Sequence, residues 1–293
     1  MDGVLNLNKP TGVTSHDVVE SVRRILKEKR IGHTGTLDPL ATGVLVLCVG
    51  KATRIAQYLE AGEKEYRAIM RLGVTTDTLD AEGRVLKTSS YTPPDRQKII
   101  GVIQNFIGMI MQQPPVYSAV KVGGVPSYRL AREGRAKPLE PRPVTIYRID
   151  LTAYEDPFVT IAVKCSKGVY IRSLCAEIGD ALGMGAHLAG LERTRSGGFS
   201  IEKSITLESL ADLAATGNTV RAVTSLDDAL AGFQSVPISE AETVRVLHGN
   251  QISCPGSLAN SSGDLVRLHS PAGTLLALAR VAAGSLKPDL VFC

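Results

Sequence analysis

One carboxylate, Asp38, lies in a short loop between Gly32 and Gly43 that is unusually rich in glycine. The loop runs directly into residues 44–49, an apolar stretch with the composition of a buried strand. Pro39 disfavours helical backbone angles at Asp38. An acid that a rigid strand holds on a loop is placed as a nucleophile or a general base would be. The loop therefore predicts a catalytic aspartate.

A structural role for Asp38 is the alternative. An Asp-Pro pair is a common turn signal, and Asp38 could cap a short helix with Pro39 at its first position and Gly43 at its end. The same window also holds His33 and three threonines, which is more special residues than a simple turn needs. A capping aspartate can also carry chemistry, so both roles stay open.

Predicted helices and strands on both sides of the loop would hold it in place. Residues 14–17 match a capping box, and the apolar residues that follow recur at helical spacing as far as Leu26. Later elements are predicted as strands over 66–72, 144–154 and 159–165, a helix over 95–106, and a turn at 167–168 leading through 169–172 into a helix that ends near 182. Because these elements lack a regular βαβ rhythm, we expect an α+β fold with a mixed, mostly antiparallel sheet.

Composition predicts a soluble protein of about two domains. The chain has 293 residues, of which 44% are hydrophobic and 21% charged. No apolar run approaches the roughly 18 residues of a membrane span, and the first residues lack the pattern of a signal peptide. The five cysteines are scattered without a CxxC pair, which argues against disulfides or a zinc site. We therefore expect a cytoplasmic protein.

Basic residues gather in one segment of the chain. Residues 121–148 hold seven bases and two acids, whereas residues 204–293 hold five bases and eight acids. A local basic block is typical of a phosphate-backbone contact, with a solvated helix face as the alternative. The block lies in a Gly- and Pro-rich excursion over about 114–143, which we expect to project as an insertion.

Several common chemistries have no motif in this chain. The sequence lacks GxxxxGK[ST] and GxGxxG loops, HExxH and paired-cysteine ligand sets, and a GxSxG elbow. With no tryptophan and 4% aromatic residues, a stacking-platform RNA binder is not expected. We expect catalysis by side chains alone, with no cofactor and no metal.

Taken together, seven segments resemble the bacterial tRNA pseudouridine synthase B (TruB) family. In chain order they are NKPTGVTS (8–15), GHTGTLDPLATG (32–43), KEY (64–66), PPVYSA (114–119), YIRSL (170–174), LERT (191–194) and GF (198–199). The resemblance implies the pseudouridine synthase fold, a large mixed sheet flanked by helices. It places a catalytic domain at 1–235 with a thumb insertion at about 115–145. It also implies a small PUA-like domain at 236–293, where the agreement fades and the negative charge departs from that of an RNA-binding module.

The resemblance implies that the chain isomerises one uridine of the tRNA T loop, at tRNA position 55, to pseudouridine without a cofactor. The uracil would be detached from C1′ at N1, rotated and rejoined through C5. Asp38 matches the essential aspartate, Arg172 the arginine that pairs with it, and Tyr66 an active-site tyrosine that stacks on the base. Without the resemblance, Arg172 is interpreted as a helix-surface arginine and Tyr66 as a core aromatic.

Further matches concern substrate binding. The resemblance implies that Tyr170 and Leu191 line the pocket and that Lys9 supports it. Because the target atoms of a stacked base are inaccessible, the nucleotide must be flipped out, and His33 matches the residue that fills the vacated space. The thumb is expected to hold the T stem-loop through phosphates and shape. Its candidate RNA-binding residues are Lys121, Arg129, Arg132 and Arg142.

The partner implied is tRNA, bound by a monomer without a guide RNA or a membrane. Three other functions remain open. A guide-dependent synthase of the dyskerin type would be expected to lack much of the thumb. A non-catalytic tRNA binder would not need Asp38, Tyr66 and Arg172 together. An N-glycosylase that releases uracil shares the first bond cleavage and is disfavoured by the resemblance alone.

Overall fold

A computed structural model describes residues 1–258, 262–282 and 284–292. Its larger part is a ten-stranded sheet in which β3 and β12 are the one parallel pair and every other pair is antiparallel. The strands follow the order β14-β1-β3-β12-β4-β11-β10-β7, with β2 beside β3 and β13 beside β12. Their bounds are β1 Gly3–Lys9, β2 Ile31–His33, β3 Thr42–Val49, β4 Lys64–Leu72, β7 Gly108–Gln112, β10 Arg142–Glu155, β11 Phe158–Cys165, β12 Ala186–Ser196, β13 Phe199–Ser200 and β14 Val223–Thr224. The expected α+β class, with a mixed and mostly antiparallel sheet, is confirmed.

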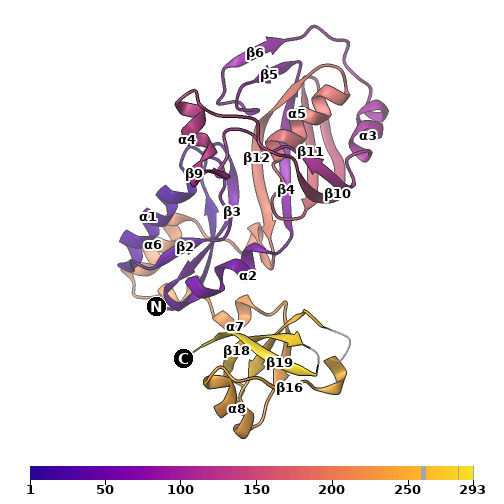
Figure 1. Ribbon diagram of the computed structural model, residues 1–293. Helices are drawn as coiled ribbons and strands as arrows, with labels where there is room; N and C mark the ends of the chain where they lie inside the picture. The colour runs from indigo at the N-terminus through magenta and orange to yellow at the C-terminus, as the bar shows by residue number, and fades with distance from the viewer. Residues whose placement is uncertain (259–261, 283, 293) are drawn as a thin grey trace.

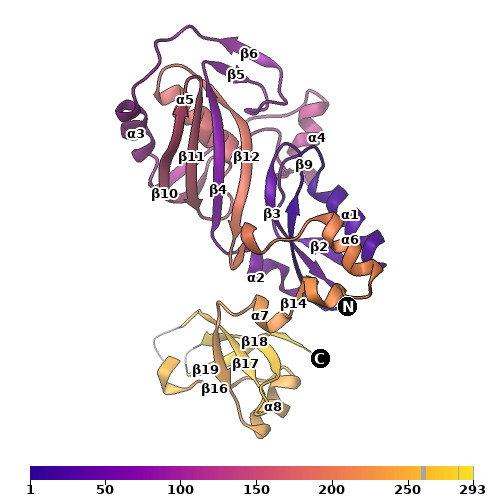
Figure 2. The same cartoon turned by 180° about the vertical axis from the view of Figure 1, so that it is seen from behind.

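Helices cover the sheet in two groups, each with its own apolar core (Figures 1 and 2). Helices α1 (Ser15–Leu26) and α6 (Leu207–Ala215) lie on the half that contains β1–β3. Helices α3 (Arg96–Gln104) and α5 (Ile171–Ala181) lie on the half that contains β4 and β10–β12. Tyr66 and Leu191 pack against both cores. These two residues therefore mark the seam between the halves.

The insertion leaves the sheet at the end of β7 and returns at the start of β10. Gln112 pairs with Arg142 in the register of these two strands, so residues 113–141 lie beyond the sheet. They form a small hairpin, β8 (Lys121–Val122) with β9 (Val125–Pro126), and helix α4 (Ser127–Arg132). A second hairpin, β5 (Val74–Thr76) with β6 (Val85–Thr88), carries the turn that begins at Asp80.

A second, five-stranded sheet forms near the C-terminus and has its own core (Figure 1). Its order is β15-β17-β18-β19-β16, and it packs with helix α8 (Glu240–Leu247). The strands are β15 Gln234–Pro237, β16 Ile252–Ser253, β17 Leu265–His269, β18 Leu275–Ala282 and β19 Ser285–Val291. The short helices α2 (Ala56–Glu60) and α7 (Leu226–Ala229) lie between the two sheets in the view of Figure 1. Among the described residues, every helix is too short or too polar to cross a membrane.

Two local predictions differ from the structure. Strand β12 was not predicted, although it lies in the middle of the large sheet between β3 and β4. Arg172 was expected in the segment before a helix, whereas it lies in the first turn of α5. The capping box at Thr14 is confirmed, because the Thr14 side chain accepts from the Asp17 amide and the Asp17 carboxylate accepts from the Thr14 amide.

Candidate active site

The loop that carries Asp38 forms a turn and not a helix. The Ala41 amide donates to the Asp38 carbonyl at 3.1 Å. The preceding residue is anchored to α1, because the Ser15 hydroxyl accepts from the Leu37 amide at 2.8 Å and lies 3.1 Å from the Leu37 carbonyl. The helix-capping interpretation of Asp38 is therefore wrong, and its side chain is free to point at another partner.

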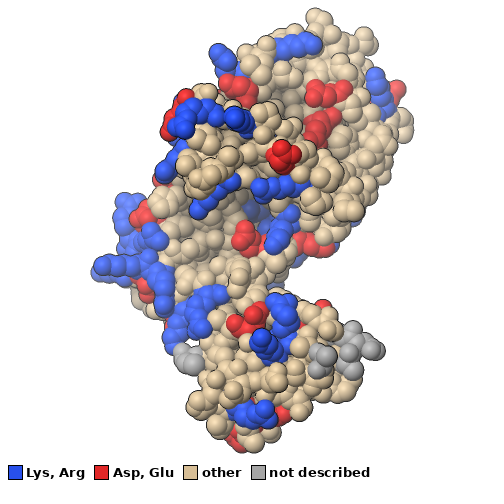
Figure 3. All heavy atoms as spheres, viewed as in Figure 1, with Lys and Arg blue, Asp and Glu red and all other residues tan. Residues whose placement is uncertain are grey.

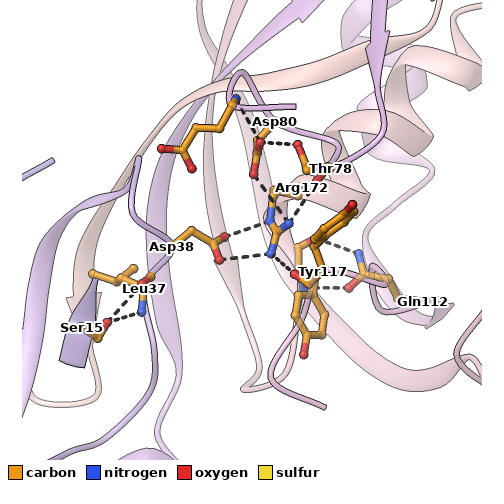
Figure 4. Close-up of polar contacts among 10 residues, drawn as sticks. Ser15, Leu37, Asp38, Thr78, Asp80, Gln112, Tyr117 and Arg172 are labelled. Carbon is orange, nitrogen blue, oxygen red and sulfur yellow. Dashed lines mark hydrogen bonds and ion pairs between the residues drawn. The ribbon is translucent and has the colours of Figure 1, made fainter. Parts of the chain in front are cut away.

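That partner is Arg172, whose guanidinium meets the Asp38 carboxylate through two nitrogens (Figure 4). The Arg172 NH2 group lies 3.1 Å from Oδ1 of Asp38, and Nε lies 2.9 Å from Oδ2. Arg172 is 5% exposed, whereas the Asp38 side chain keeps 34% of its surface exposed. A two-point pair fixes both the charge and the orientation of the carboxylate. The residue interpreted without the resemblance as a helix-surface arginine is thus a buried partner of Asp38.

Arg172 is held by three further acceptors, all from segments distant in sequence. Its guanidinium donates to the carbonyls of Thr78 at 3.0 Å and Tyr117 at 2.8 Å. Its NH1 group also lies 3.6 Å from a carboxylate oxygen of Asp80. Asp80 was expected only as part of a turn, and its 6% exposed side chain was not among the predicted site residues. One buried guanidinium therefore joins two carboxylates, the β5–β6 hairpin and the start of the insertion.

The charges around Asp38 act on its pKa in opposite directions. Burial has the largest effect and raises the pKa of the Asp38 carboxyl, and the Asp80 charge acts the same way. The Arg172 guanidinium opposes both by its charge and by its hydrogen bond, and Lys9 opposes them to a smaller extent. Arg172 is thus the main group that opposes this rise and favours the ionised form of Asp38.

Tyr66, Tyr170 and Leu191 line a cavity of about 250 Å³ together with Asp38 and Arg172. Burial raises the pKa of both tyrosine hydroxyls. The predicted pocket residues are therefore brought together in one place. This cavity lies at the seam between the two cores, which explains why one strand, β12, supplies a wall shared by both halves of the sheet.

Lys9 supports the Asp38 loop from its buried side. It is fully buried, and its Nζ donates to the carbonyls of Pro10, Val13 and Pro39 at 2.9, 2.6 and 3.2 Å. Pro39 directly follows Asp38, so this ammonium group fixes the turn from inside the protein. Burial lowers the pKa of Lys9 to about 8, with the Asp38 charge opposing that shift.

Arg193 is a second buried cation that sequence reasoning did not select. It is 2% exposed and donates to the carbonyls of Val44 at 2.7 Å and Gly35 at 3.0 Å, on the two sides of Asp38. The Arg193 charge also works against the burial that raises the pKa of Tyr66. Its position in LERT was the available signal, since that segment was matched for its leucine.

A wider cavity of about 810 Å³ opens between the Asp38 loop and the insertion. It is lined by His33 and Asp38 on one side and by Tyr128, Arg129 and Arg132 of the insertion on the other. Burial lowers the pKa of His33 and so favours its neutral form. On the face drawn in Figure 3, Lys and Arg side chains border the hollow below the insertion.

The other two predicted RNA-binding residues lie further out. Lys121 is exposed on β8, and Arg142 is exposed at the start of β10, and neither is among the residues that line the wide cavity. Two bases of the block, Arg135 and Arg148, are paired with neighbouring acids. In the part of the chain that the structure describes, no group of three or more His, Cys, Asp or Glu side chains could hold a metal ion.

The sequence matches the models of two known protein domains. Residues 23–171 match the model of the TruB family pseudouridylate synthase N-terminal domain, and residues 172–235 match that of the tRNA pseudouridylate synthase B C-terminal domain. The chain belongs to the TruB family. The two matches divide the chain at Arg172, so the Asp38–Arg172 pair joins the two regions that define the family.

Curated relatives align with nearly the whole of this chain. The tRNA pseudouridine synthase B of Syntrophus aciditrophicus is 44% identical over 288 residues, which are 96% of this chain and 91% of the relative. That of Geobacter sulfurreducens is 40% identical over 280 residues, 96% of this chain and 90% of the relative. Among solved structures, a Cbf5-Nop10-Gar1 complex matches with a TM-score of 0.79 and 32% identity, covering 99% of this chain and 85% of that chain. An H/ACA RNP bound to a substrate RNA containing 2′-deoxyuridine matches with a TM-score of 0.76.

Proposed function

We propose that this protein converts the T-loop uridine at tRNA position 55 to pseudouridine, with Asp38 as its catalytic carboxylate. Membership of the TruB family makes the chain a tRNA pseudouridine synthase, an isomerase that acts on tRNA. The observation that supports the proposed mechanism is the two-point pair between Asp38 and Arg172 at a cavity walled by two tyrosines.

The proposed reaction changes which atom of the uracil is joined to the ribose. The N1–C1′ bond breaks, the uracil rotates within the cavity, and a C5–C1′ bond forms. The hydrogen of C5 leaves as a proton, and N1 takes up a proton. Asp38 supplies the carboxylate that assists this exchange, because covalent assistance divides one difficult step into easier ones. Arg172 favours the ionised form of that carboxylate and fixes its orientation, and Tyr66 stacks on the uracil from the cavity wall.

Access to the uridine requires that it leave the stack of the T loop. We infer that the nucleotide flips into the smaller cavity and that His33, which lines the wider one, occupies the space it vacates. The exposed bases Arg129 and Arg132 face this same space from α4 and suit the phosphates of a stem-loop. Residues 236–293 would then form a small PUA-like domain beside a catalytic domain at 1–235.

We further propose that the protein acts as a monomer without a guide RNA or a cofactor. The insertion, whose exposed bases Arg129 and Arg132 line the wide cavity, supports direct recognition of a stem-loop. The Cbf5 neighbours belong to assemblies with other proteins, so the guide-dependent alternative is a real competitor. An assay with one purified chain separates the two.

The test uses purified protein and an unmodified tRNA labelled with tritium at C5 of uridine. In the presence of a metal chelator, we expect release of one equivalent of tritium per tRNA, and the same release from a T stem-loop fragment. Free uracil as the product would identify an N-glycosylase. Activity that needs an added guide RNA or added proteins would contradict the stand-alone proposal.

A further inference from the structure

The neck of the insertion contains a buried amide that the proposed mechanism does not use. Gln112 is the last residue of β7, paired in register with Arg142, and its side chain lies where the chain leaves the large sheet. It is 2% exposed, although most of the insertion beyond it is exposed. A buried amide must satisfy both its donor and its acceptor, so its partners reveal what it holds.

Two of its bonds go to main-chain groups of a single residue, Tyr170. The Gln112 Oε1 accepts from the Tyr170 amide at 2.8 Å, and the Gln112 Nε2 donates to the Tyr170 carbonyl at 3.1 Å (Figure 4 draws both bonds at Gln112). The side chain thus pairs with the main chain of this residue as a neighbouring strand would. Tyr170 is the N-cap residue of α5, and Arg172 follows two residues later in the first turn. Gln112 therefore fixes the start of the helix that carries Arg172.

Two more contacts join the same pair of segments. The Ser173 hydroxyl donates to the Gln113 carbonyl at 3.0 Å, and the Arg172 guanidinium donates to the Tyr117 carbonyl at 2.8 Å. Residues 112–117 lead into the insertion, and residues 170–173 begin α5. The first residues of the insertion and the first turn of α5 are thus bonded as one unit.

A half-buried carboxyl faces this amide from the next turns of α5. Burial raises the pKa of Glu177 to about 7, while its hydrogen bond with Gln112 opposes that shift. Asp180 raises the pKa of Glu177 further, and Arg142 is the register partner of Gln112 on β10. Helix α5 and strand β10 thus place charged residues of both signs near the neck of the insertion.

We infer that Gln112 is a positioning residue that ties the placement of the insertion to the orientation of Arg172, and through it to Asp38. When RNA fixes the insertion, this connection fixes the first turn of α5 in the same step. Loss of the two Gln112 bonds would leave Arg172 with its carbonyl contacts but with a looser helix start. The inference rests on the proposed roles of Asp38 and Arg172.

The test compares two adjacent glutamines. Gln112→Met keeps the volume of the side chain and removes both bonds to Tyr170. Gln113→Met is the matched control, because the Gln113 amide donates only within the insertion, to the Leu139 carbonyl at 3.1 Å. We expect Gln112→Met to lower kcat about tenfold or more and to keep the tRNA Kd within about threefold of wild type. The reason is that a misplaced reacting group slows the reaction without weakening binding. Gln113→Met should keep kcat within about twofold.

A pH profile of Gln112→Glu separates positioning from general stability. A protonated carboxyl offers one donor and one acceptor, as the amide does, whereas the ionised form faces the Tyr170 carbonyl and Glu177 without a donor. Burial and Glu177 both raise the pKa of the introduced acid. Relative to wild type at the same pH, kcat of Gln112→Glu should be nearly restored at about pH 6 and fall about tenfold by about pH 8.5.

Three results would overturn the inference. They are a kcat of Gln112→Met close to wild type, an equal fall in kcat and affinity, and a flat pH ratio for Gln112→Glu. Each ratio is measured on whichever tRNA the wild-type protein modifies. An inactive wild type, or one that modifies another uridine, would contradict the proposed function instead, so the two failures are distinguishable.

Discussion

At the scale of residues, the centre of the site is one guanidinium between two carboxylates. Arg172 is almost fully buried and meets Asp38 at two points and Asp80 at 3.6 Å. A buried arginine keeps its charge, so the triad carries one net negative charge when both acids are ionised. Asp38 is the more exposed of the two acids and faces the cavity. The arrangement leaves the more exposed charge on Asp38, the acid that we propose as the catalytic carboxylate.

The pH dependence of kcat should report the Asp38 pKa. Because burial and Asp80 raise that pKa, protonation should switch activity off along an acidic limb above the usual value of 3.8. Asp80→Asn removes one raising charge, so the limb should move to lower pH. Its plateau kcat should fall about tenfold, because Arg172 loses a partner. Asp77→Asn, on the same hairpin, is the control and should leave the limb in place. A limb that moves to higher pH in Asp80→Asn would contradict this electrostatic account.

At the scale of elements, the Asp38 loop depends on close contact between β3 and β12. Gly43 has φ +98° and would place a Cβ 2.3 Å from the Arg193 carbonyl oxygen. Gly43→Ala therefore combines a left-handed backbone, which costs about 1–2 kcal/mol, with a main-chain clash. We expect a larger loss of unfolding free energy in urea than for Gly183→Ala, and a fall in kcat. At Gly183 φ is +81° and a Cβ would meet open space. Equal effects of the two variants would show that the strand contact does not matter.

The insertion should account for much of the salt dependence of tRNA binding. Replacing Arg129, Arg132 and Arg142 by Gln removes three bases that have no ion pair among the described residues. The slope of log K against log salt should flatten by about 2, since each phosphate contact contributes about 0.7–0.9. The double variant of Arg135 and Arg148, which are already paired with acids, is the matched control. An unchanged slope in the triple variant would remove the insertion from the RNA-binding surface.

How far the sequence predicts the fold differs between elements. Helix α1 was predicted because its capping box and its apolar spacing are local signals. Strand β12 was missed because it carries three charged residues, at 192, 193 and 195, and an irregularity near Gly190 that breaks its alternation. Its parallel pairing with β3 joins residues about 150 positions apart, for which no short-range pattern exists.

The residues of the site also differ in whether the sequence predicts them. Asp38 was found from its glycine loop, and Arg172 from the family resemblance. Asp80 looked like an ordinary turn residue, because its role comes from its contact with the Arg172 guanidinium, which lies 92 positions away in the chain. Gln112 gave no signal at all, since two of its bonds go to main-chain atoms of Tyr170, which nearly any residue type would offer. Contacts that depend on tertiary placement alone are the ones that sequence patterns do not predict.

At the scale of the whole molecule, an ion cluster joins α7 to the C-terminal sheet. Asp227 on α7 pairs with Arg267 and His269 of β17, and these hydrogen bonds lower the pKa of Asp227 although burial opposes them. Because the Asp227 pKa is lowered in the folded protein, the cluster stabilises the folded state at pH values above the usual carboxyl pKa. This stabilisation is lost as the pH falls through the lowered pKa.

The active site lies away from this connection, which gives a prediction for Asp227→Asn. We expect faster cleavage near residues 226–237 in limited proteolysis at neutral pH. The kcat on a T stem-loop should stay within about twofold of wild type. Asp264→Asn, directly before β17 of the same domain, serves as the control for a simple change of charge. A large loss of kcat in Asp227→Asn would show that the two sheets cooperate in catalysis.

The most direct test of the central claim is the conversion of T-loop uridine by wild type and by Asp38→Asn. Both proteins are incubated with unmodified tRNA, pseudouridine is mapped by position, and tRNA binding is measured on the same preparations. Wild type should convert the uridine at position 55. Asp38→Asn should show no turnover while its Kd stays within a few-fold of wild type, as expected for a group that acts in the reaction and not in binding. Turnover by Asp38→Asn, or conversion of a uridine outside the T loop by wild type, would contradict the account.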